Sequence, residues 1–491
     1  MISFIISLTA LVLGYFLYGK FVEHIVGPDA QRKTPCYVSG DGVDYIPMPT
    51  WKVYLIQFLN IAGTGPIFGA IQGILFGPAA FFWIVLGCIF GGAVHDYLSA
   101  MISLRRNGAN LPEIIGDELG NTTRFVMRIC ALVLMVLVGA VFCTTPAGLL
   151  ESMTSVQDGF IGSKLFWMLV IIAYYILATL LPIDKIIGSI YPVFGMALLI
   201  MALGMIGGIF VYDGNIPEIT EAFANHHPTS SIPIFPGLCI TIACGAVSGF
   251  HATQSPMMAR CIKNERLGRR VFYGAMITEG IIALVWAAAA IKFADSITEY
   301  SGTPYEKLWA LMTQGGTTNA NPAVIVNIIC HSWLGAVGAV LAILGVVAAP
   351  ITSGDTAFRC ARLIVADFLH LKQDRIAKRL MISIPIFAIA IVLLFVNFDV
   401  LWRYFAWFNQ TLSVFTFWAI TVYLAKAGKN YWVTFVPALF MTYVCTTYIC
   451  VAPEGLTIPQ TISYCVGLVL LIVAVCWFFT WKKKVSGNSI A

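Results

Sequence analysis

Long apolar stretches separated by short polar ones dominate the sequence. A helix of about 20 apolar residues crosses the hydrocarbon core of a bilayer, so this pattern predicts membrane-spanning helices. The stretches that qualify are thirteen: residues 2–24, 52–76, 79–104, 125–150, 165–181, 186–211, 234–258, 270–292, 322–351, 378–397, 401–425, 431–450 and 459–481. We therefore expect an all-α polytopic membrane protein.

The composition agrees with this interpretation. The chain of 491 residues is 59% hydrophobic and 11% charged, whereas soluble domains are roughly 45–50% apolar and about 25% charged. A net charge of +5 is too small and too dispersed for nucleic-acid binding. The thirteen cysteines form no C-x-x-C pair and predict neither a disulfide framework nor a zinc site. We expect no cofactor and no bound metal.

The distribution of positive charge predicts the orientation. Of the 29 lysines and arginines, 25 lie in one set of alternate loops and four in the other. Lysine and arginine accumulate in cytoplasmic loops. We therefore expect the N-terminus outside and the C-terminus in the cytoplasm. No basic segment precedes the first apolar stretch, so we expect it to remain as a span rather than to be cleaved as a signal peptide.

Two predicted spans carry breaks near their middle. The second contains glycines and a proline within residues 60–69, and the seventh contains them within 248–256. Glycine permits non-helical dihedral angles, and proline suits the first turn of a restarted helix. Each break alone could be an ordinary kink. As a pair in matching positions of two halves, however, they indicate a transporter binding site.

The spacing of the breaks predicts an inverted repeat of five plus five helices, as in LeuT-like folds. Each half begins with a broken helix, and the halves enter the membrane from opposite sides. One helix precedes the repeats and two follow them. The expected units are an extra N-terminal helix with a cytoplasmic loop, two five-helix repeats, and two C-terminal helices with a basic tail, over residues 1–50, 51–231, 232–427 and 428–491.

The broken helices also predict the chemistry of the site. Unwound carbonyls can coordinate a cation, and helix N-termini favour an anion such as a carboxylate. Phe68 or Phe250 could gate this site. His251 lies in the second break and titrates near neutral pH. The candidate substrate-binding residues are Ala62, Gly63, Thr64, Gly65, Phe250, His251, Thr253, Gln254 and Ser255.

Five further residues are candidates for ion coupling: Asp96, Lys185, Thr352, Ser353 and Asp355. The two hydroxyls could meet the carbonyls of the first break and hold Na⁺, whereas a protonatable neighbour would carry H⁺. Each also has a structural interpretation. The hydroxyls and Asp355 could cap a helix, and Lys185 could reach the membrane interface.

Asp96 and two further ionisable residues at membrane depth leave alternatives open. Asp96 could simply pair with Arg105 or Arg106 at its helix end. Glu279 and His331 are equally consistent with a structural or a functional role, because intramembrane ionisable groups are functional candidates by default.

Six segments together resemble the carbon starvation protein CstA family: residues 41–45, 61–66, 105–109, 249–260, 352–359 and 403–412. The resemblance implies a bacterial inner-membrane uptake system with a five-plus-five inverted fold. It also implies peptides as substrates or, as in close relatives, pyruvate with proton coupling. The chain is shorter at its C-terminal end than the long enteric members.

We therefore expect a secondary active transporter for small carboxylate-bearing nutrients, above all peptides, that works by alternating access with H⁺ rather than Na⁺. A pyruvate/proton symporter is the alternative. A channel, which also uses broken helices, and a membrane-embedded enzyme are remote alternatives. The sequence contains no G-x-S-x-G or H-E-x-x-H motif, so we expect no catalytic residues.

Overall fold

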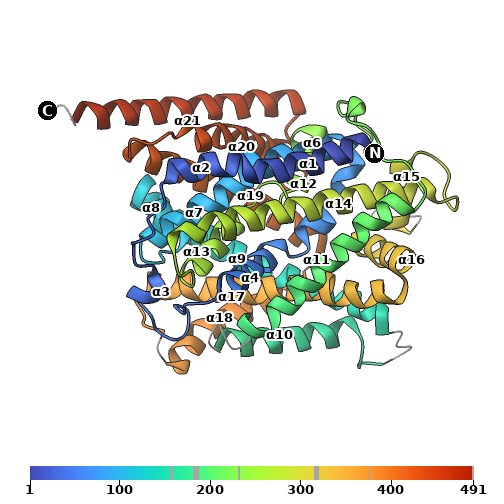
Figure 1. Ribbon diagram of the computed structural model, residues 1–491, viewed down its shortest axis with the longest axis horizontal. Helices are drawn as coiled ribbons and strands as arrows, with labels where there is room; N and C mark the ends of the chain where they lie inside the picture. The colour runs from blue at the N-terminus through green and yellow to red at the C-terminus, as the bar shows by residue number, and fades with distance from the viewer. Residues whose placement is uncertain are drawn as a thin grey trace.

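Helices account for all the regular structure in the described part of the chain. The computed structural model describes residues 1–154, 159–180, 187–229, 233–314, 320–373, 375–396 and 398–488. No strand occurs within these ranges, and most of the long helices run in roughly one direction (Figure 1). The predicted all-helical class is confirmed.

The elements are grouped by the residue ranges of the predicted units, whose division into two five-helix repeats stays a prediction. The N-terminal part contains α1 (Ile2–Phe16), α2 (Tyr18–Val26) and α3 (Pro35–Val38). The next part contains α4 (Thr50–Ala62), η1 (Gly65–Gly69), α5 (Ala70–Gly73), η2 (Ile74–Phe76), α6 (Ala79–Leu86), η3 (Gly87–Gly92), α7 (Ala93–Arg105), α8 (Leu111–Leu119), α9 (Asn121–Thr154), α10 (Lys164–Leu180), α11 (Ile187–Val211) and η4 (Ile219–Glu221). The third part contains α12 (Ile234–Thr241), α13 (His251–Ala259), η5 (Glu265–Leu267), η6 (Arg269–Tyr273), α14 (Gly274–Ser296), α15 (Pro304–Thr313), α16 (Pro322–Ala342), η7 (Ile343–Val347), α17 (Ala348–Phe368), α18 (Ile376–Leu393) and α19 (Phe398–Lys426). Two helices complete the chain, α20 (Trp432–Val451) and α21 (Gln460–Asn488).

The helices are those of a multi-pass membrane protein. Within the described residues, nine helices are long and apolar enough to cross a membrane, and the bent pair Thr50–Ala62 and Gly65–Phe76 would make ten. There are also two shorter apolar helices, Lys164–Thr179 and Pro322–Gly338. The predicted total of thirteen spans stays a prediction.

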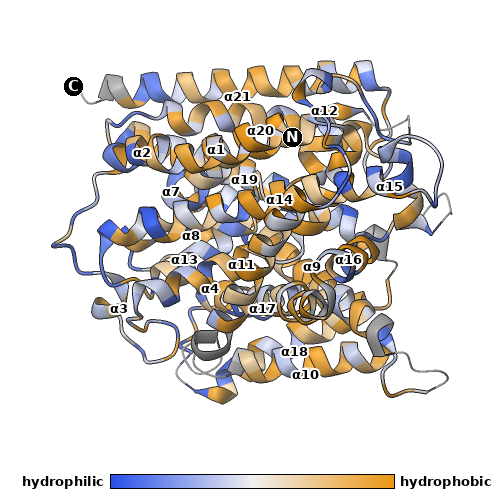
Figure 2. Ribbon diagram, turned by 45° about the vertical axis from the view of Figure 1, so that its right-hand side comes forward, coloured by the Kyte–Doolittle hydropathy of each residue, from blue (hydrophilic) through white to orange (hydrophobic). Residues whose placement is uncertain are grey.

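The outer helices carry apolar side chains on their exposed sides. Leu203 on α11, Ile384 on α18 and Val473 on α21 are all more than half exposed. Hydrophobic residues fill the middle of the ribbon in Figure 2, and hydrophilic ones lie mainly toward its two ends. Such an exposed apolar band fits a lipid environment.

The first predicted break is confirmed. Helix α4 ends at Ala62, and Gly63 has φ 42° and ψ −143°, which a residue with a Cβ atom rarely adopts. Pro66 lies in the first turn of η1. The two parts of the span, Thr50–Ala62 and Gly65–Phe76, are bent by 51°.

The second break lies earlier than predicted. Residues 242–250 are not helical, and His251 to Pro256 are part of α13 rather than of the break. Pro256 therefore lies inside α13, and the helix begins at His251. The freed backbone groups explain the position: the indole N–H of Trp83 donates to the carbonyl of Ile242 at 2.9 Å. Non-helical backbone at membrane depth requires such partners.

The ninth predicted span, 322–351, has the wrong bounds. Helix α16 is kinked at Gly335, where φ is 58° and ψ is −143°, and the span that passes the length test is Val340–Phe368. Thr352 and Ser353 therefore lie within a span and not at its cytoplasmic end. The charge-based boundary failed because the helix continues through Arg359 and Arg362, both fully buried.

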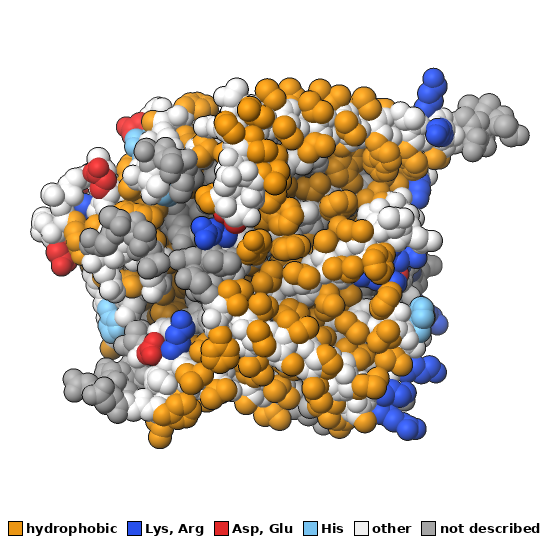
Figure 3. Space-filling model, turned by 180° about the vertical axis from the view of Figure 1, so that it is seen from behind, with side chains coloured by type: hydrophobic (Ala, Val, Ile, Leu, Met, Phe, Trp, Pro, Cys, Tyr) orange, Lys and Arg blue, Asp and Glu red, His pale blue; other side chains and the backbone are white. Residues whose placement is uncertain are grey.

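One end of the molecule, which we name the basic face, gathers the loops rich in lysine and arginine. Figure 3 shows most of the visible Lys and Arg side chains at one edge. Arg105 at the end of α7 donates to the carbonyl of Gly27 at 3.0 Å and pairs with Glu265 at 2.7 Å. Lys426 at the end of α19 pairs with Glu118 at 2.8 Å.

The opposite end, which we name the vestibule face, contains the loops 212–229 and 297–303. The N-terminal amine of Met1 pairs there with Glu218 at 2.6 Å, and His226 stacks on Tyr305 with ring centroids 4.4 Å apart. Helix α21 ends at the other side, where Lys482 donates to the hydroxyl of Tyr431 at 2.9 Å. The two ends of the chain thus lie at opposite faces (Figure 1). Which face is cytoplasmic stays a prediction.

Candidate functional site

The two breaks lie directly against each other. A Cβ atom added to Gly65 would come within 2.3 Å of the Cβ atom of Cys244. Gly69 in the same segment also lies close to the end of α12, just before the second break. A Cβ atom added there would lie 2.8 Å from the carbonyl oxygen of Thr241. Glycine is therefore what allows the two backbones to approach. The predicted meeting of the two breaks is observed, although substrate binding there is untested.

The first break contains buried polar groups that lack partners. Ala62, Gly63, Thr64 and Gly65 are all buried. Within the described residues, neither the hydroxyl of Thr64 nor the side-chain amide of Asn60 has a hydrogen-bond partner. Buried polar groups are normally paired, so these two side chains mark a position where a ligand or water would be stabilised. Asn60 was not among the predicted site residues.

Asn409 on α19 supports the second break. Its side-chain oxygen accepts hydrogen bonds from the backbone N–H of Phe250 at 2.7 Å and from the hydroxyl of Ser248 at 3.0 Å. Its backbone oxygen accepts from the N–H of Gly249 at 3.2 Å. One residue therefore holds the unwound chain where α13 begins. Sequence reasoning noticed the segment that contains Asn409 but assigned it no role.

The N-terminus of α13 is less open to an anion than predicted. The N–H groups of His251 and Thr253 donate to the carbonyls of Ser248 and Phe250 at 3.2 and 3.0 Å. Together with the bond from Phe250 to Asn409, they leave few free donors in the first turn. In this conformation an anion would have to replace existing hydrogen bonds.

The polar side chains on α13 are engaged within the protein. The hydroxyl of Thr253 donates to the carbonyl of Phe250 at 2.6 Å, and the amide of Gln254 donates to that hydroxyl at 3.1 Å. Ser255 accepts from the side-chain amide of Gln57 at 3.0 Å, which ties α13 to α4. Gln57 is a further residue that the sequence did not indicate.

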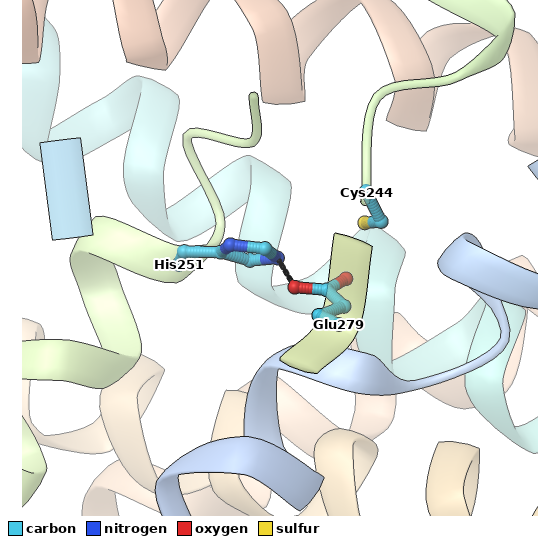
Figure 4. Close-up of side chains that lie close together, drawn as sticks. All are labelled: Cys244, His251 and Glu279. Carbon is cyan, nitrogen blue, oxygen red and sulfur yellow. Dashed lines mark ion pairs between the residues drawn. The ribbon is translucent and has the colours of Figure 1, made fainter. Parts of the chain in front are cut away.

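Four ionisable side chains form a fully buried chain, which we name the histidine–carboxylate chain: His95, Asp96, His251 and Glu279. Asp96 Oδ1 lies 2.9 Å from Nδ1 of His95, and Oδ2 lies 3.0 Å from Nδ1 of His251. Nε2 of His251 lies 3.5 Å from Oε2 of Glu279 (Figure 4). The chain joins α7, α13 and α14, three helices that are distant in sequence.

The alternative partners considered for Asp96 are excluded by this geometry. Arg105 pairs with Glu265 at 2.7 Å, and Arg106 pairs with Asp117 at 3.1 Å. Both arginines lie at the basic face, whereas Asp96 sits between two and three turns deeper on α7. Asp96 therefore belongs to the histidine–carboxylate chain.

Of the four residues in this chain, Glu279 should be the most costly to bury in its ionised form. It is fully buried on α14, and neither carboxylate oxygen has a well-aligned hydrogen-bond partner among the described residues. An ionised carboxylate buried without such partners is costly. A bound proton would remove the cost, and so would a bound cation.

The same position contains the set of described residues that could hold a metal ion. One ligand atom each from Cys244, His251 and Glu279 lie within 4.8 Å of one another, and Figure 4 shows the three side chains converging. Thiolate, imidazole and carboxylate together suit a divalent transition metal. The sequence did not predict this convergence, because Cys244 and Glu279 come from different elements.

The ion-coupling candidates on α17 divide into two contacts. Ser353 donates to the carbonyl of Leu59 at 3.1 Å, so the expected approach of this hydroxyl to the first broken helix is observed. Asp355 instead accepts from the hydroxyl of Tyr191 at 2.6 Å. Thr352 donates to the carbonyl of Ala349 at 2.7 Å. Lys185 lies outside the described residues.

A buried ion-pair cluster, which we name the basic-face latch, closes the space below the breaks. Asp44, from the loop before α4, lies 3.1 Å from Nη1 of Arg359 and 3.4 Å from Nη2 of Arg362. Burial alone would raise the pKa of Asp44, but the guanidinium groups of Arg362 and Arg359 outweigh it and hold the pKa below its ordinary value. Sequence reasoning placed both arginines in a loop and missed the latch.

The vestibule face, by contrast, is hollowed. A cavity of about 720 Å³ extends from its surface to Phe68 of η1. Its walls come from α5, from the ends of α9 and α10, from α16 and from the start of α19. Phe68, which follows the first break along the chain, thus lines this cavity, and its role as a gate stays a prediction. Phe250 is fully buried and packs edge to face on Phe142, with ring centroids 6.2 Å apart.

These features define a class of protein. Broken helices that meet at membrane depth around buried ionisable groups are characteristic of membrane transporters. The family model described as "Carbon starvation protein CstA" matches residues 1–157 and 145–308. The chain therefore belongs to the CstA family, as its sequence motifs suggested.

Individual proteins with similar sequences agree with this family assignment. An uncharacterized membrane protein of Haemophilus influenzae is 46% identical over 343 residues, which are 60% of this chain and 92% of that protein. The peptide transporter CstA of Campylobacter jejuni is 27% identical over 89% of this chain and 78% of its own length. The pyruvate/proton symporter BtsT of Escherichia coli is 26% identical over 61% of this chain and 50% of its own length.

A solved structure has the same overall fold. The manganese transporter of Eremococcus coleocola superimposes with a TM-score of 0.52 over 91% of this chain and 98% of that protein, at 13% sequence identity. At this identity the likeness concerns the fold alone. This arrangement of helices therefore also occurs in a solved membrane transporter.

Proposed function

We propose that this CstA-family protein is a secondary active transporter that imports small carboxylate-bearing nutrients, above all peptides, by proton-coupled alternating access. One observation carries the proposal: two broken helices meet beside a fully buried chain of histidines and carboxylates. The inverted five-plus-five repeat, with one helix before it and two after it, is the architecture that places the breaks in this way.

The substrate site is proposed between the two breaks. It comprises Ala62 to Gly65 on one side and Phe250, His251, Thr253, Gln254 and Ser255 on the other. The unpartnered Thr64 and Asn60 supply hydrogen bonds that a carboxylate or a peptide group can complete. Binding at the second break would replace bonds that α13 makes within the protein, so substrate would couple to movement of that helix.

The histidine–carboxylate chain is proposed as the proton path. Asp96 fixes the ring of His251 through Nδ1 and thereby directs Nε2 toward Glu279. A proton on Glu279 would neutralise a carboxylate that is costly to bury. Its release toward the other side of the membrane would restore that cost and favour the next conformation. Because His251 lies at the start of α13, the same residue connects proton and substrate.

A sodium site is the weaker alternative for coupling. Thr352, Ser353 and Asp355 lie on α17, and Ser353 reaches the carbonyl of Leu59 in the first broken helix. However, Asp355 points to Tyr191 instead, so these oxygens do not converge on one point. Protons therefore remain the proposed coupling ion.

The two faces suggest the conformation and the orientation. The basic face is closed by the basic-face latch, and the vestibule face is hollowed down to Phe68. We place the basic face in the cytoplasm of a bacterium, on the basis of the charge distribution. The N-terminus is then outside, and the structure corresponds to a state open to the exterior.

A pyruvate/proton symporter is the second candidate, because a relative with that name is 26% identical. Both substrates present a carboxylate, so the same half-helix geometry could serve either. The inner site, by which we mean the proposed substrate site between the two breaks, would be smaller for a pyruvate transporter. Measurements with the two substrates distinguish the two candidate functions.

The test is uptake into proteoliposomes that contain the purified protein. Labelled dialanine and labelled pyruvate are compared, each with and without an inward proton gradient. We expect saturable, gradient-driven accumulation of the peptide and no accumulation of pyruvate. Accumulation of pyruvate alone would select the second candidate, and no saturable uptake of either would overturn the proposal.

Glu279→Gln tests the coupling. The substitution keeps the size of the side chain but cannot release a proton. We expect it to lose accumulation driven by the proton gradient and to retain exchange of labelled for unlabelled substrate. Glu299→Gln, on an exposed loop after α14, is the matched control. Normal gradient-driven accumulation by Glu279→Gln would reject the proton path.

A further inference from the structure

The vestibule contains an ammonium group for which the described residues provide no partner. Lys164 begins α10, is half-buried and lines the cavity of about 720 Å³. Among the described residues, its ammonium group forms no hydrogen bond and no ion pair. Lys307 differs, although it lies on the same face, because its ammonium donates to the carbonyl of Ile297 at 2.8 Å.

Two side-chain amides line the same cavity. Gln72 on α5 and Asn327 on α16 are half-buried, and the described residues provide no hydrogen-bond partner for either side chain. Three polar groups from three separate elements thus face one hollow with their hydrogen-bonding capacity unused. Groups of this kind in a concave site indicate a ligand that supplies the missing partners.

The chemistry of the three groups selects the ligand. An ammonium group forms a charge-assisted hydrogen bond with a carboxylate, and the amide N–H groups can donate to the same anion. The amide oxygens are then available for the N–H groups of a peptide. The backbone N–H of Lys164 donates to Glu151 at 2.8 Å, so this carboxylate is engaged by the start of α10.

We propose that Lys164, Gln72 and Asn327 form an outer carboxylate-binding site that captures substrate before Phe68 admits it to the breaks. The proposal rests on the proposed transport function for its role, but its ligand chemistry follows from the cavity itself. The ligand is a small carboxylate, either free as in pyruvate or at the C-terminus of a short peptide. A peptide can also donate its N–H groups to the amide oxygens of Gln72 and Asn327, whereas pyruvate has no N–H group to donate.

The test measures binding and transport separately. Lys164→Gln, Lys164→Arg and the control Lys307→Gln are purified in lipid nanodiscs, each with the inner site disabled by Thr253→Ala and Gln254→Ala. Binding of labelled dialanine and of labelled pyruvate is measured at equilibrium. The loss of one charge-assisted hydrogen bond predicts about a tenfold weaker Kd for Lys164→Gln. Lys164→Arg and Lys307→Gln should bind as the parent does.

Transport by the single variants completes the test. Lys164→Gln should raise KM about as much as it weakens binding and should leave kcat unchanged, because the residue is remote from the breaks. Binding by Lys164→Gln equal to that of Lys307→Gln would overturn the outer site while transport by the native protein still stood. Binding at Lys164 without any saturable uptake would instead overturn the transport function and leave the outer site supported.

Discussion

The basic face and the vestibule face treat their charged groups in opposite ways. At the basic face, Asp44 neutralises two buried arginines, and Arg105 and Lys426 are paired with carboxylates. At the vestibule face, Lys164 lines an open cavity and has no partner among the residues that the structure describes. Charges that the protein pairs with one another hold a closed region together. A charge left without a partner beside a cavity is available to a ligand.

The difference has an energetic basis. Buried arginines are stable only when a carboxylate and good hydrogen bonds compensate for lost hydration, so the basic-face latch must open as a unit. A half-exposed ammonium keeps part of its hydration and needs no protein partner. Opening of the basic face should therefore be the costly step, and capture of substrate at the vestibule face the easy one.

The largest expected effect comes from Asp44→Asn, which removes the charge of the basic-face latch. Two guanidinium groups would stay buried without Asp44, which should cost the closed state about 3–5 kcal/mol. The basic face should then open more often. Cys261 reports this, because it is fully buried and its thiol lies 3.7 Å from the carbonyl oxygen of Asp44. Alkylation by N-ethylmaleimide, read for each cysteine by mass spectrometry, should be faster in the variant.

The control for this experiment lies three residues away. Asp41 is exposed and accepts hydrogen bonds from the backbone N–H groups of residues 43–45, so Asp41→Asn makes the same chemical change outside the latch. Exposed Cys465 serves as the internal reference and should react equally in all proteins. Unchanged protection of Cys261 in Asp44→Asn would show that the latch does not hold the basic face closed.

An intermediate effect on stability is expected where the two breaks meet. Gly65→Ala would place a Cβ atom 2.3 Å from the Cβ atom of Cys244, and overpacking of this kind costs about 1–3 kcal/mol. The midpoint of thermal unfolding should fall, and Cys244→Gly in the same chain should restore much of it. Gly207→Ala is the matched control, because an added Cβ atom there meets nothing within 4 Å. Equal midpoints for both single variants would contradict the tight contact.

The smallest effect is the response of the two faces to acid. Burial lowers the pKa of His227 to about 4, and its ring packs against Phe76 and Trp309 with centroid distances of 4.8 and 5.7 Å. A free histidine has a pKa near 6.5, so the packed loop loses stability as pH falls from about 6.5 toward 4. Asp44 has a lowered pKa, so the latch loses stability as the pH falls from the ordinary carboxyl pKa of about 4 toward that lowered value.

Hydrogen exchange at pH 7 and pH 5, corrected for intrinsic rates, separates these responses. Residues 222–229 should exchange faster at pH 5, and residues 41–48 should not change. His227→Phe preserves the packing without the titration and should abolish the difference at the vestibule face. Faster exchange of both segments at pH 5 would contradict the contrast between the faces.

Much of the fold was accessible from local patterns. The first break was predicted at residues 60–69 because Gly63 and Pro66 have strong intrinsic backbone preferences, and it lies there. The second break was displaced, because its limits depend on Trp83 and Asn409, which satisfy the freed backbone groups from other helices. No local pattern identifies such partners. The span that ends at Phe368 was predicted to end too early for a similar reason. Its Arg359 and Arg362 can be buried because Asp44, from a distant part of the sequence, pairs with them.

The sequence by itself determined that the chain is helical, crosses a membrane many times, breaks two of its helices and belongs with the CstA family. The helical class, the spans and the breaks follow from composition, spacing and backbone preference, which are local, and the family relationship follows from the resemblance of short sequence motifs. Only the tertiary structure decided that Asp96 pairs with His251, that Glu279 completes their chain and that Lys164 faces a cavity. Those contacts join helices far apart in sequence, and their energies depend on burial and distance, which exist only once the helices have packed.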